Sequence, residues 1–260
     1  MKTALITGAS YGIGATFARE LAGRKTDLIL VARSEDKLQQ LATELQEQHG
    51  IKAEAIAQDL TEPAAGTKLF ESVTQKGSTV DLLINNAGFG DYGIFVDRDL
   101  QRQLDMVQLN IKVLVELTYL FLNQMRERSS GSIINVSSIG GFQPIPYMSV
   151  YAASKAFVLS FTEALRAENQ NTGVTFQALC PGPTESNFFE NAKFPQSVSA
   201  TSSQNYASSE EVVRDSLDAL EKNQSNVVTG SFINQVIVNL PRFLPRELLV
   251  NAIEKQFRKS

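Results

Sequence analysis

Short apolar runs alternate with longer segments of helical periodicity along most of the chain, and this alternation is the strongest constraint on its fold. Several runs, such as Leu28 to Ala32, are apolar at every position, which is typical of strands in a parallel sheet covered on both faces by helices. Right-handed crossovers join such strands. The sequence therefore predicts an α/β fold built on a doubly wound parallel sheet. The expected strands lie at 3–7, 27–32, 52–58, 81–88, 132–138, 173–180 and 226–229.

Helix signals separate these runs. Ser34 is a good N-cap and is followed by two acidic residues, while Pro63 suits an early position in a helix. The expected helices lie at 14–24, 34–48, from about 62, 99–128, 150–169 and 209–222.

The 260 residues contain neither an internal repeat nor a linker that would divide them, so we expect a single domain over 1–260. One long polar segment, at about 183–207, carries Phe188, Phe189 and Phe194. Loops of this length in a compact domain are usually functional, and we expect this one to contact substrate. An apolar tail with interspersed cations follows at about 231–260.

A glycine-rich turn, TGASYGIG (7–14), joins the first strand to the first helix. Gly8, Gly12 and Gly14 allow a tight turn and a close approach of a ligand, and the helix N-terminus offers free N–H groups to a pyrophosphate. The spacing is G-x-x-x-G-x-G, which differs from the common G-x-G-x-x-G fingerprint. Its place directly after the first strand nevertheless predicts a dinucleotide site.

The end of the second strand predicts which dinucleotide binds. An NAD site has an acidic residue there for the ribose 2′-hydroxyl, whereas this chain has Ala32 and then Arg33. A guanidinium suits a 2′-phosphate, and Ser34 and Lys37 could add donors. We therefore expect NADP(H).

Composition excludes several other classes. The net charge of -4 disfavours a nucleic-acid partner. The single cysteine, Cys180, fits a reducing compartment, and the single histidine, His49, makes a metal site or a Ser-His-Asp triad improbable. No apolar run reaches the roughly 18 residues of a membrane-spanning helix. We expect a cytoplasmic protein with no metal.

Six motifs together resemble the short-chain dehydrogenase/reductase family over about residues 1–190, and more weakly to about 230. They are TGASYGIG, NNAG (85–88), Asn110, Ser138, YAASK (151–155) and CPGPTES (180–186). The resemblance implies a Rossmann-type fold with a parallel sheet of about seven strands, a nicotinamide cofactor and a homo-oligomer, dimer or tetramer. It also implies a catalytic tetrad of Asn110, Ser138, Tyr151 and Lys155.

The resemblance assigns further roles. Asp59 would contact adenine, the 86–88 segment would lie beside the adenosine ribose, and Asn110 would hold a water near the active-site lysine. Ser186 stands where the family usually has threonine, a mild departure. The cofactor-binding residues expected in all are Gly8, Ser10, Tyr11, Gly12, Ile13, Gly14, Arg33, Asp59, Leu60, Asn86, Ala87, Gly88, Tyr151, Lys155, Pro181, Gly182, Thr184 and Ser186.

The family serine lies thirteen residues before the tyrosine, which selects Ser138 rather than Ser137. A free tyrosine has a pKa of about 10, and the charge of Lys155 would lower it. Tyr151 could then exchange a proton with a carbonyl or alcohol oxygen that Ser138 hydrogen-bonds. The expected function is an NADP(H)-dependent oxidoreductase that interconverts a carbonyl and a secondary alcohol.

Two alternatives remain: an NAD-linked alcohol dehydrogenase, and a nicotinamide-binding sensor or scaffold without turnover. An apolar wall is expected around the substrate, which favours a hydrophobic carbonyl compound. The tail could seal a subunit interface or lie on a membrane surface, and its few cations favour the interface. The wall residues are Phe142, Pro144, Ile145, Tyr147, Phe188 and Phe189.

Overall fold

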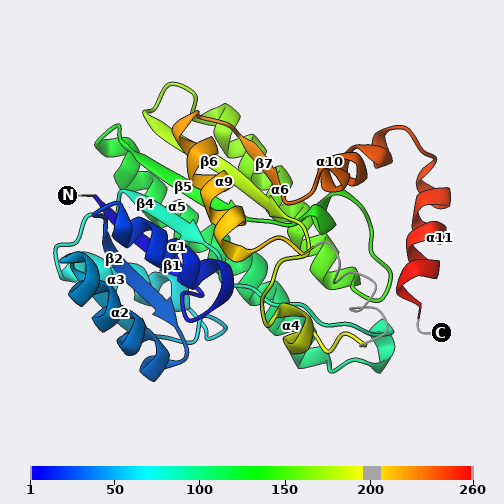
Figure 1. The fold of residues 1–260 in the computed structure, drawn as a ribbon, viewed down its shortest axis with the longest axis horizontal. Helices are drawn as coiled ribbons and strands as arrows, with labels where there is room; N and C mark the ends of the chain where they lie inside the picture. The colour runs from blue at the N-terminus through cyan, green and yellow to red at the C-terminus, as the bar shows by residue number, and fades with distance from the viewer. Residues whose placement is uncertain (1, 196–205, 259–260) are drawn as a thin grey trace.

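The computed structural model describes residues 2–195 and 206–258. Seven parallel strands form one sheet in the order β3-β2-β1-β4-β5-β6-β7, with helices on both faces (Figure 1). The predicted doubly wound, Rossmann-type fold is therefore confirmed. The strands are β1 (Thr3–Thr7), β2 (Asp27–Ala32), β3 (Ala53–Ala57), β4 (Leu82–Asn85), β5 (Gly131–Val136), β6 (Val174–Pro181) and β7 (Asn226–Thr229).

The helices follow the predicted segments with two differences. The third helix begins at Ala65, after Ala64 in a left-handed conformation, rather than at Glu62–Pro63. The segment expected as one helix over 99–128 contains a π-helical turn. The helices are α1 (Gly12–Gly23), α2 (Glu35–His49), α3 (Ala65–Gln75), α4 (Leu100–Val107), the π turn η2 (Gln108–Val113), α5 (Leu114–Glu127), α6 (Ser149–Glu168), α7 (Phe188–Asn191), α9 (Ser209–Glu221), α10 (Phe232–Asn239) and α11 (Arg246–Phe257), with 3-10 turns η1 (Phe95–Asp97), η3 (Ile139–Phe142) and η5 (Leu240–Arg242).

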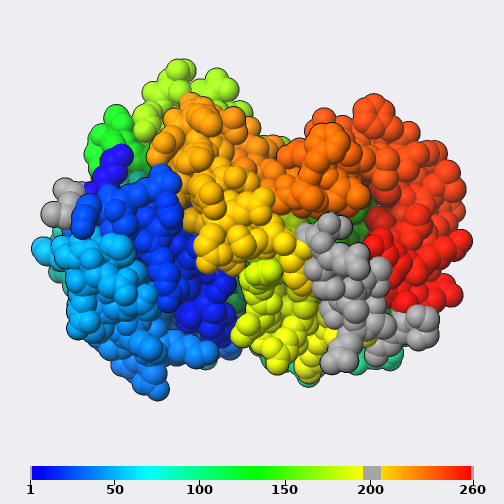
Figure 2. Space-filling view, in the orientation of Figure 1, coloured from blue at the N-terminus to red at the C-terminus, as the bar shows by residue number. Residues whose placement is uncertain are grey.

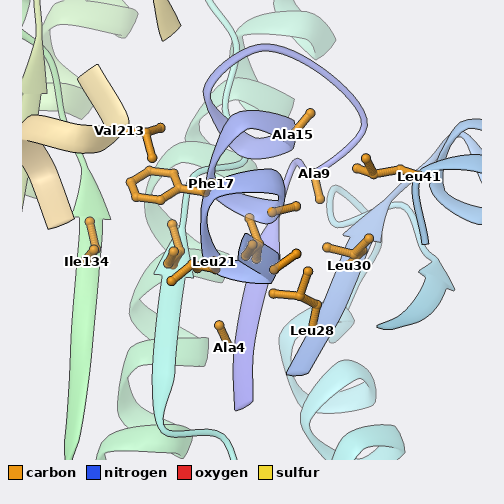
Figure 3. Close-up of a cluster of buried hydrophobic side chains, with 14 of the residues drawn as sticks. Ala4, Ala9, Ala15, Phe17, Leu21, Leu28, Leu30, Leu41, Ile134 and Val213 are labelled. Atoms are coloured by element: carbon orange, nitrogen blue, oxygen red, sulfur yellow. The ribbon is translucent and has the colours of Figure 1, made fainter. Parts of the chain in front are cut away.

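Alternate residues of the central strands are buried on opposite faces of the sheet. In β2, Leu28 and Leu30 pack with Phe17 of α1, whereas Ile29 and Val31 join the core under α3 and α5, which includes Phe121. Figure 3 shows the first of these cores, where α1 lies over the strands. Burial on both faces is the reason why these strands are apolar at every position.

The strand order reverses between β1 and β4, the neighbours at the centre of the sheet. In open α/β sheets, ligands bind beyond the carboxyl ends of the strands at such a switch point. The turns after β1, β4, β5 and β6 carry the predicted site residues, so the topology alone brings them to one edge.

The last described residues form a separate C-terminal arm (232–257: α10, η5 and α11). Figure 1 shows the arm to one side of the sheet, and Figure 2 shows it as a distinct lobe. Pro241 and Pro245 interrupt the arm before its final helix. Within the described ranges, no helix is both long enough and apolar enough to cross a bilayer.

Candidate active site

The turn between β1 and α1 is packed tightly against the segment that follows β4. Gly8 has a φ of 66°, and a Cβ on Gly14 would lie 2.2 Å from the carbonyl oxygen of Gly8. The Asn86 side chain donates hydrogen bonds to the carbonyl oxygens of Thr7 (2.9 Å) and Gly8 (3.1 Å). The N-terminus of α1 is thereby held at the edge of the sheet, where its free N–H groups suit a phosphate.

Two cations lie beside this turn, Arg33 just after β2 and Lys37 in the first turn of α2. The Nη1 atom of Arg33 lies 4.0 Å from Oδ2 of Asp59, and the Arg33 side chain is 73% exposed. The Lys37 Nζ atom lies 4.7 Å from the ring centroid of Tyr11. Asp59 is fixed by Thr61, whose backbone N–H and hydroxyl both donate to Oδ1 (2.9 and 2.8 Å). This corner of the site can therefore receive an anionic group.

Asn110 lies in the π turn between α4 and α5 and is buried. Its side-chain oxygen accepts from the Phe89 N–H (3.1 Å), and its Nδ2 donates to the Phe89 carbonyl (3.0 Å) and to the Ser154 hydroxyl (3.1 Å). Ser154 in turn donates to the carbonyl oxygen of Tyr151 (2.7 Å). π-helical turns inside α-helices are frequent at functional sites.

Ser138, Tyr151 and Lys155 meet where β5 and α6 face each other. Tyr151 lies in the first turn of α6, and the Lys155 Nζ atom lies 5.8 Å from its ring centroid and donates to the Val136 carbonyl (2.8 Å). Ser138 accepts a hydrogen bond from the Gly140 N–H (3.0 Å). Ser137, the serine that was not selected, instead donates to the Lys155 carbonyl (2.7 Å).

One cavity of about 1010 Å³ connects these groups. Every predicted cofactor-binding residue except Gly14 lines it, and so does Ser138. Gly14 is packed against Gly8, and Asn110 is hydrogen-bonded to the backbone of Phe89. The structure therefore brings the turns after β1, β2, β3, β4, β5 and β6 together around a single space.

Comparison with known proteins agrees with this arrangement. The family described as "short chain dehydrogenase" matches residues 2–196, three quarters of the chain. The chain belongs to the short-chain dehydrogenase/reductase family.

Three similar proteins illustrate the relationship. The very-long-chain 3-oxoacyl-CoA reductase of Anas platyrhynchos is 37% identical over 185 residues, which cover 68% of this chain but only 58% of that relative. A short-chain dehydrogenase from Sphingobium yanoikuyae, solved in complex with NADPH, is 30% identical with a TM-score of 0.82, covering 95% of this chain and 97% of that one. The bulky-bulky ketone specific alcohol dehydrogenase from Comamonas testosteroni is 29% identical with a TM-score of 0.78, covering 95% and 96%.

The residues around the turn fit the nicotinamide dinucleotide that this family implies. A Cβ on Gly12 would lie 3.3 Å from the Cβ of Ser186, so a side chain there would narrow the gap between the turn and the loop after β6. The backbone of Gly12 and Ile13 would hold the pyrophosphate, Asp59 the adenine end, and Lys155 the nicotinamide ribose. These assignments remain predictions from the family pattern.

The protein environment of Tyr151 differs from the expectation. Burial raises the pKa of Tyr151 to about 12, and a hydrogen bond with Ser138 offsets only part of that rise. The Lys155 Nζ atom donates its hydrogen bond to the Val136 carbonyl (2.8 Å) and lies 5.8 Å from the centroid of the Tyr151 ring. The phenol is consequently fully protonated at neutral pH, which is the state required of a proton donor.

Burial also acts on Lys155. It lowers the pKa of Lys155 from 10.5 to about 8. At neutral pH the ammonium is therefore charged, but close to the pH at which it loses its proton.

We expect this buried charge to give the Lys155→Met variant a measurable pH signature. Between pH 8 and 10.5 the unfolded chain holds a proton that the folded chain has released, so wild-type stability rises with pH across this window. Methionine has no such proton, so the stability of the variant relative to wild type should fall by up to roughly 3 kcal/mol from pH 7.5 to 10.5. Urea unfolding of both proteins at several pH values measures this, and parallel pH curves would contradict the buried ammonium.

The predicted apolar wall is only partly correct. Ile145, Phe188 and Phe189 line the cavity, whereas Pro144 lies outside the lining. Phe142 packs instead against the small core of Leu159, Ala178 and Cys180. Tyr147 instead donates a hydrogen bond to Glu254 of α11 (2.7 Å).

Other lining residues were not predicted. The C-terminal arm supplies an apolar side of the cavity, and Arg102 and Phe89 contribute near α4. A helical repeat of apolar residues at 249 and 253 was visible in the sequence, but it could not show which part of the chain these residues face. The lining residues from the arm are Ile233, Asn234, Ile237, Leu240, Leu249, Ala252, Ile253, Gln256 and Phe257.

Proposed function

We propose that this chain is an NADP(H)-dependent oxidoreductase that interconverts a hydrophobic ketone and the corresponding secondary alcohol. One observation carries the proposal. The Tyr151 phenol, with Ser138 and Lys155 beside it, lines the same cavity as the glycine turn on one side and the apolar residues of α7 and the C-terminal arm on the other. A dinucleotide site and an apolar substrate space thus share one proton donor.

The residues of the chain have distinct tasks in this reaction. A reduced nicotinamide, when bound, supplies the hydride. Ser138 donates a hydrogen bond to the substrate oxygen, where negative charge develops, and Tyr151 gives that oxygen its proton. The Lys155 ammonium stabilises the resulting phenolate, and Asn110 with water connects the lysine to solvent. The reverse sequence oxidises the alcohol.

The apolar lining and the names of the relatives support this substrate class. A relative in Anas platyrhynchos is named as a reductase of very-long-chain 3-oxoacyl-CoA, and a solved neighbour from Comamonas testosteroni as specific for bulky-bulky ketones. The apolar lining supplied by α7, α10 and α11 supports ketones with a large apolar group rather than charged sugars.

A panel of carbonyl compounds tests the proposal. NADPH oxidation would be followed with aryl ketones, long-chain 3-oxoacyl esters, small ketones and charged keto acids. Highest kcat/KM for the first two groups supports the proposal. A clear preference for keto acids would contradict the substrate class, and no oxidation with any member would favour the non-catalytic sensor.

The cofactor preference has its own test. Arg33→Asp replaces the guanidinium at the end of β2 by the acid of an NAD site, so we expect the Kd for NADPH to rise roughly 10- to 100-fold while NADH binds at least as well as before. Lys68→Asp, at an exposed position of α3, is the matched charge reversal. Unchanged NADPH affinity in Arg33→Asp would favour the NAD-linked alternative.

We also propose that a second copy of the chain covers the outer face of the C-terminal arm. Phe232 and Phe243 are 82% and 81% exposed, and Leu248 is 63% exposed. Large apolar side chains this exposed on one segment are typical of a surface that meets another protein or a membrane. Sedimentation with and without lipid vesicles tests this: a dimer or tetramer without lipid supports the proposal, whereas a monomer that binds vesicles would show that the arm meets a membrane surface.

A further inference from the structure

A buried carboxylate lies at the edge of the active site in the segment after β4. The Asp91 side chain is fully buried and accepts hydrogen bonds from three side chains. Arg98 donates from Nε and Nη2 (both 2.7 Å), Arg102 from Nε (2.9 Å) and Gln103 from Nε2 (2.8 Å). Burial raises the pKa of Asp91, but the hydrogen bonds from Arg98 and Arg102 outweigh it and hold the pKa below its usual value. Asp91 is thus a fixed anion that orients two arginines.

The two arginines differ in what else they contact. The Arg102 guanidinium bonds Asp91 through Nε, and its Nη2 donates to the carbonyl oxygen of Asn191 (2.7 Å). The neighbouring carbonyl, that of Ala192, accepts from the backbone N–H of Tyr92 (2.8 Å). Both carbonyls lie at the C-terminal end of α7, where a helix has unpaired acceptors that favour a cation. For Arg98, the side-chain hydrogen bonds found in the described part of the chain go to Asp91.

Helix α7, which accepts the hydrogen bond from Arg102, also carries an aromatic side chain that contacts Tyr151. Phe188, the first residue of α7, lies 5.1 Å from Tyr151 between ring centroids. On its other side, Phe188 packs so closely on Gly90 that a Cβ there would lie 2.8 Å from the Phe188 Cζ. Because α7 has only four residues, its position depends on contacts at both of its ends.

We propose that Arg102 is a positioning residue that fixes α7 and thereby holds Phe188 as the apolar wall next to the reacting carbonyl. Arg102 joins the buried anion at Asp91 to the C-terminal end of α7, so the location of Phe188 is set from the far side of the helix. The proposal rests on the ketone reductase function proposed above. Its consequence is specificity: ketones with a large apolar group bind against Phe188, whereas small ketones do not need it.

Two conservative variants separate this role from a general structural one. Arg102→Lys keeps the charge near Asp91, but a single ammonium cannot bond Asp91 and the Asn191 carbonyl in the same geometry. Arg98→Lys makes the same chemical change at the other arginine bonded to Asp91, which makes no side-chain hydrogen bond to α7 among the described residues. We expect Arg102→Lys to lower kcat/KM for an aryl ketone about tenfold, through KM, and to lower kcat/KM for acetone less, so that the ratio of aryl ketone to acetone falls. Arg98→Lys should leave the ratio of aryl ketone to acetone unchanged, even if it lowers Tm.

A measurement without turnover keeps the result independent of the proposed function. Hydrogen exchange of a peptide covering 187–192 should be faster in Arg102→Lys than in Arg98→Lys or wild type. If exchange is faster but no ketone is reduced by wild type, α7 is held by Arg102 and the proposed function has failed. If both variants shift the substrate ratio equally, or neither changes exchange at 187–192, the positioning role is wrong.

If Arg102→Lys folds poorly, the variant Phe188→Ala tests the same proposal. It removes the wall while Asp91 and both arginines stay in place, so the same tenfold loss with aryl ketones is expected. Retention of wild-type aryl ketone activity in Phe188→Ala would overturn the proposal.

Discussion

Tyr151→Phe is expected to reduce turnover of a ketone by roughly 10²- to 10⁴-fold, the range that one general acid contributes. The substitution removes only the phenolic oxygen. The ring keeps its 5.1 Å contact with Phe188 and its place in the first turn of α6. Because burial raises the pKa of Tyr151 to about 12, the wild-type hydroxyl is protonated throughout the physiological range, so the loss should be nearly independent of pH between 6 and 8.

Two measurements divide this loss between chemistry and binding. Single-turnover reduction of an aryl ketone reports the chemical step, and NADPH fluorescence reports cofactor affinity, which should change less than about threefold. Tyr119→Phe, at an exposed position of α5, is the matched control and should behave as wild type. Turnover within tenfold of wild type in Tyr151→Phe would mean that another group delivers the proton.

The fold could be predicted because its determinants are local and repeated. Strands such as β2 are buried on both faces and therefore carry an uninterrupted apolar sequence, while the helices between them have the longer period. Boundaries were less predictable where local signals compete. Glu62–Pro63 is a plausible helix start, but the chain adopts a left-handed conformation at Ala64 and begins the helix one residue later.

The candidate site was predictable to a different extent. The motif residues that follow strands fall at the carboxyl ends of neighbouring strands, so sheet topology was sufficient to place them together. Asn110, Tyr151 and Lys155 lie in helical segments, and family spacing was needed to place them in the site. The contacts of Asp91 and Arg102 with α7, and the approach of the C-terminal arm to the cavity, join residues that are distant in sequence. No periodicity or motif encodes such contacts. For the same reason, the sequence predicted Phe142 and Tyr147 in the apolar wall of the cavity. In the structure Phe142 packs on Leu159 and Tyr147 donates a hydrogen bond to Glu254.

Gly14→Ala is expected to weaken NADPH binding by roughly 10- to 100-fold, because the added methyl group meets the Gly8 backbone and an Asn86 side chain held by two hydrogen bonds. The new Cβ would lie 2.2 Å from the Gly8 carbonyl oxygen and 2.6 Å from the Asn86 side-chain nitrogen. Overpacking of this kind typically costs about 1–3 kcal/mol, and the turn can relieve it only by moving away from α1. That movement displaces the N–H groups that would hold the pyrophosphate, so the cost should appear in the Kd for NADPH as well as in the free energy of unfolding.

Gly23→Ala is the matched control, since it adds the same methyl group to the same helix. No heavy atom lies within 4 Å of a Cβ at Gly23, and alanine is a better helix former than glycine by about 1 kcal/mol. We therefore expect Gly23→Ala to keep its NADPH affinity and to gain slightly in stability. NADPH titration and urea unfolding of both variants measure the Kd for NADPH and the free energy of unfolding. If Gly14→Ala bound NADPH as tightly as Gly23→Ala, the close packing of Gly14 on Gly8 would not determine the geometry of the phosphate site.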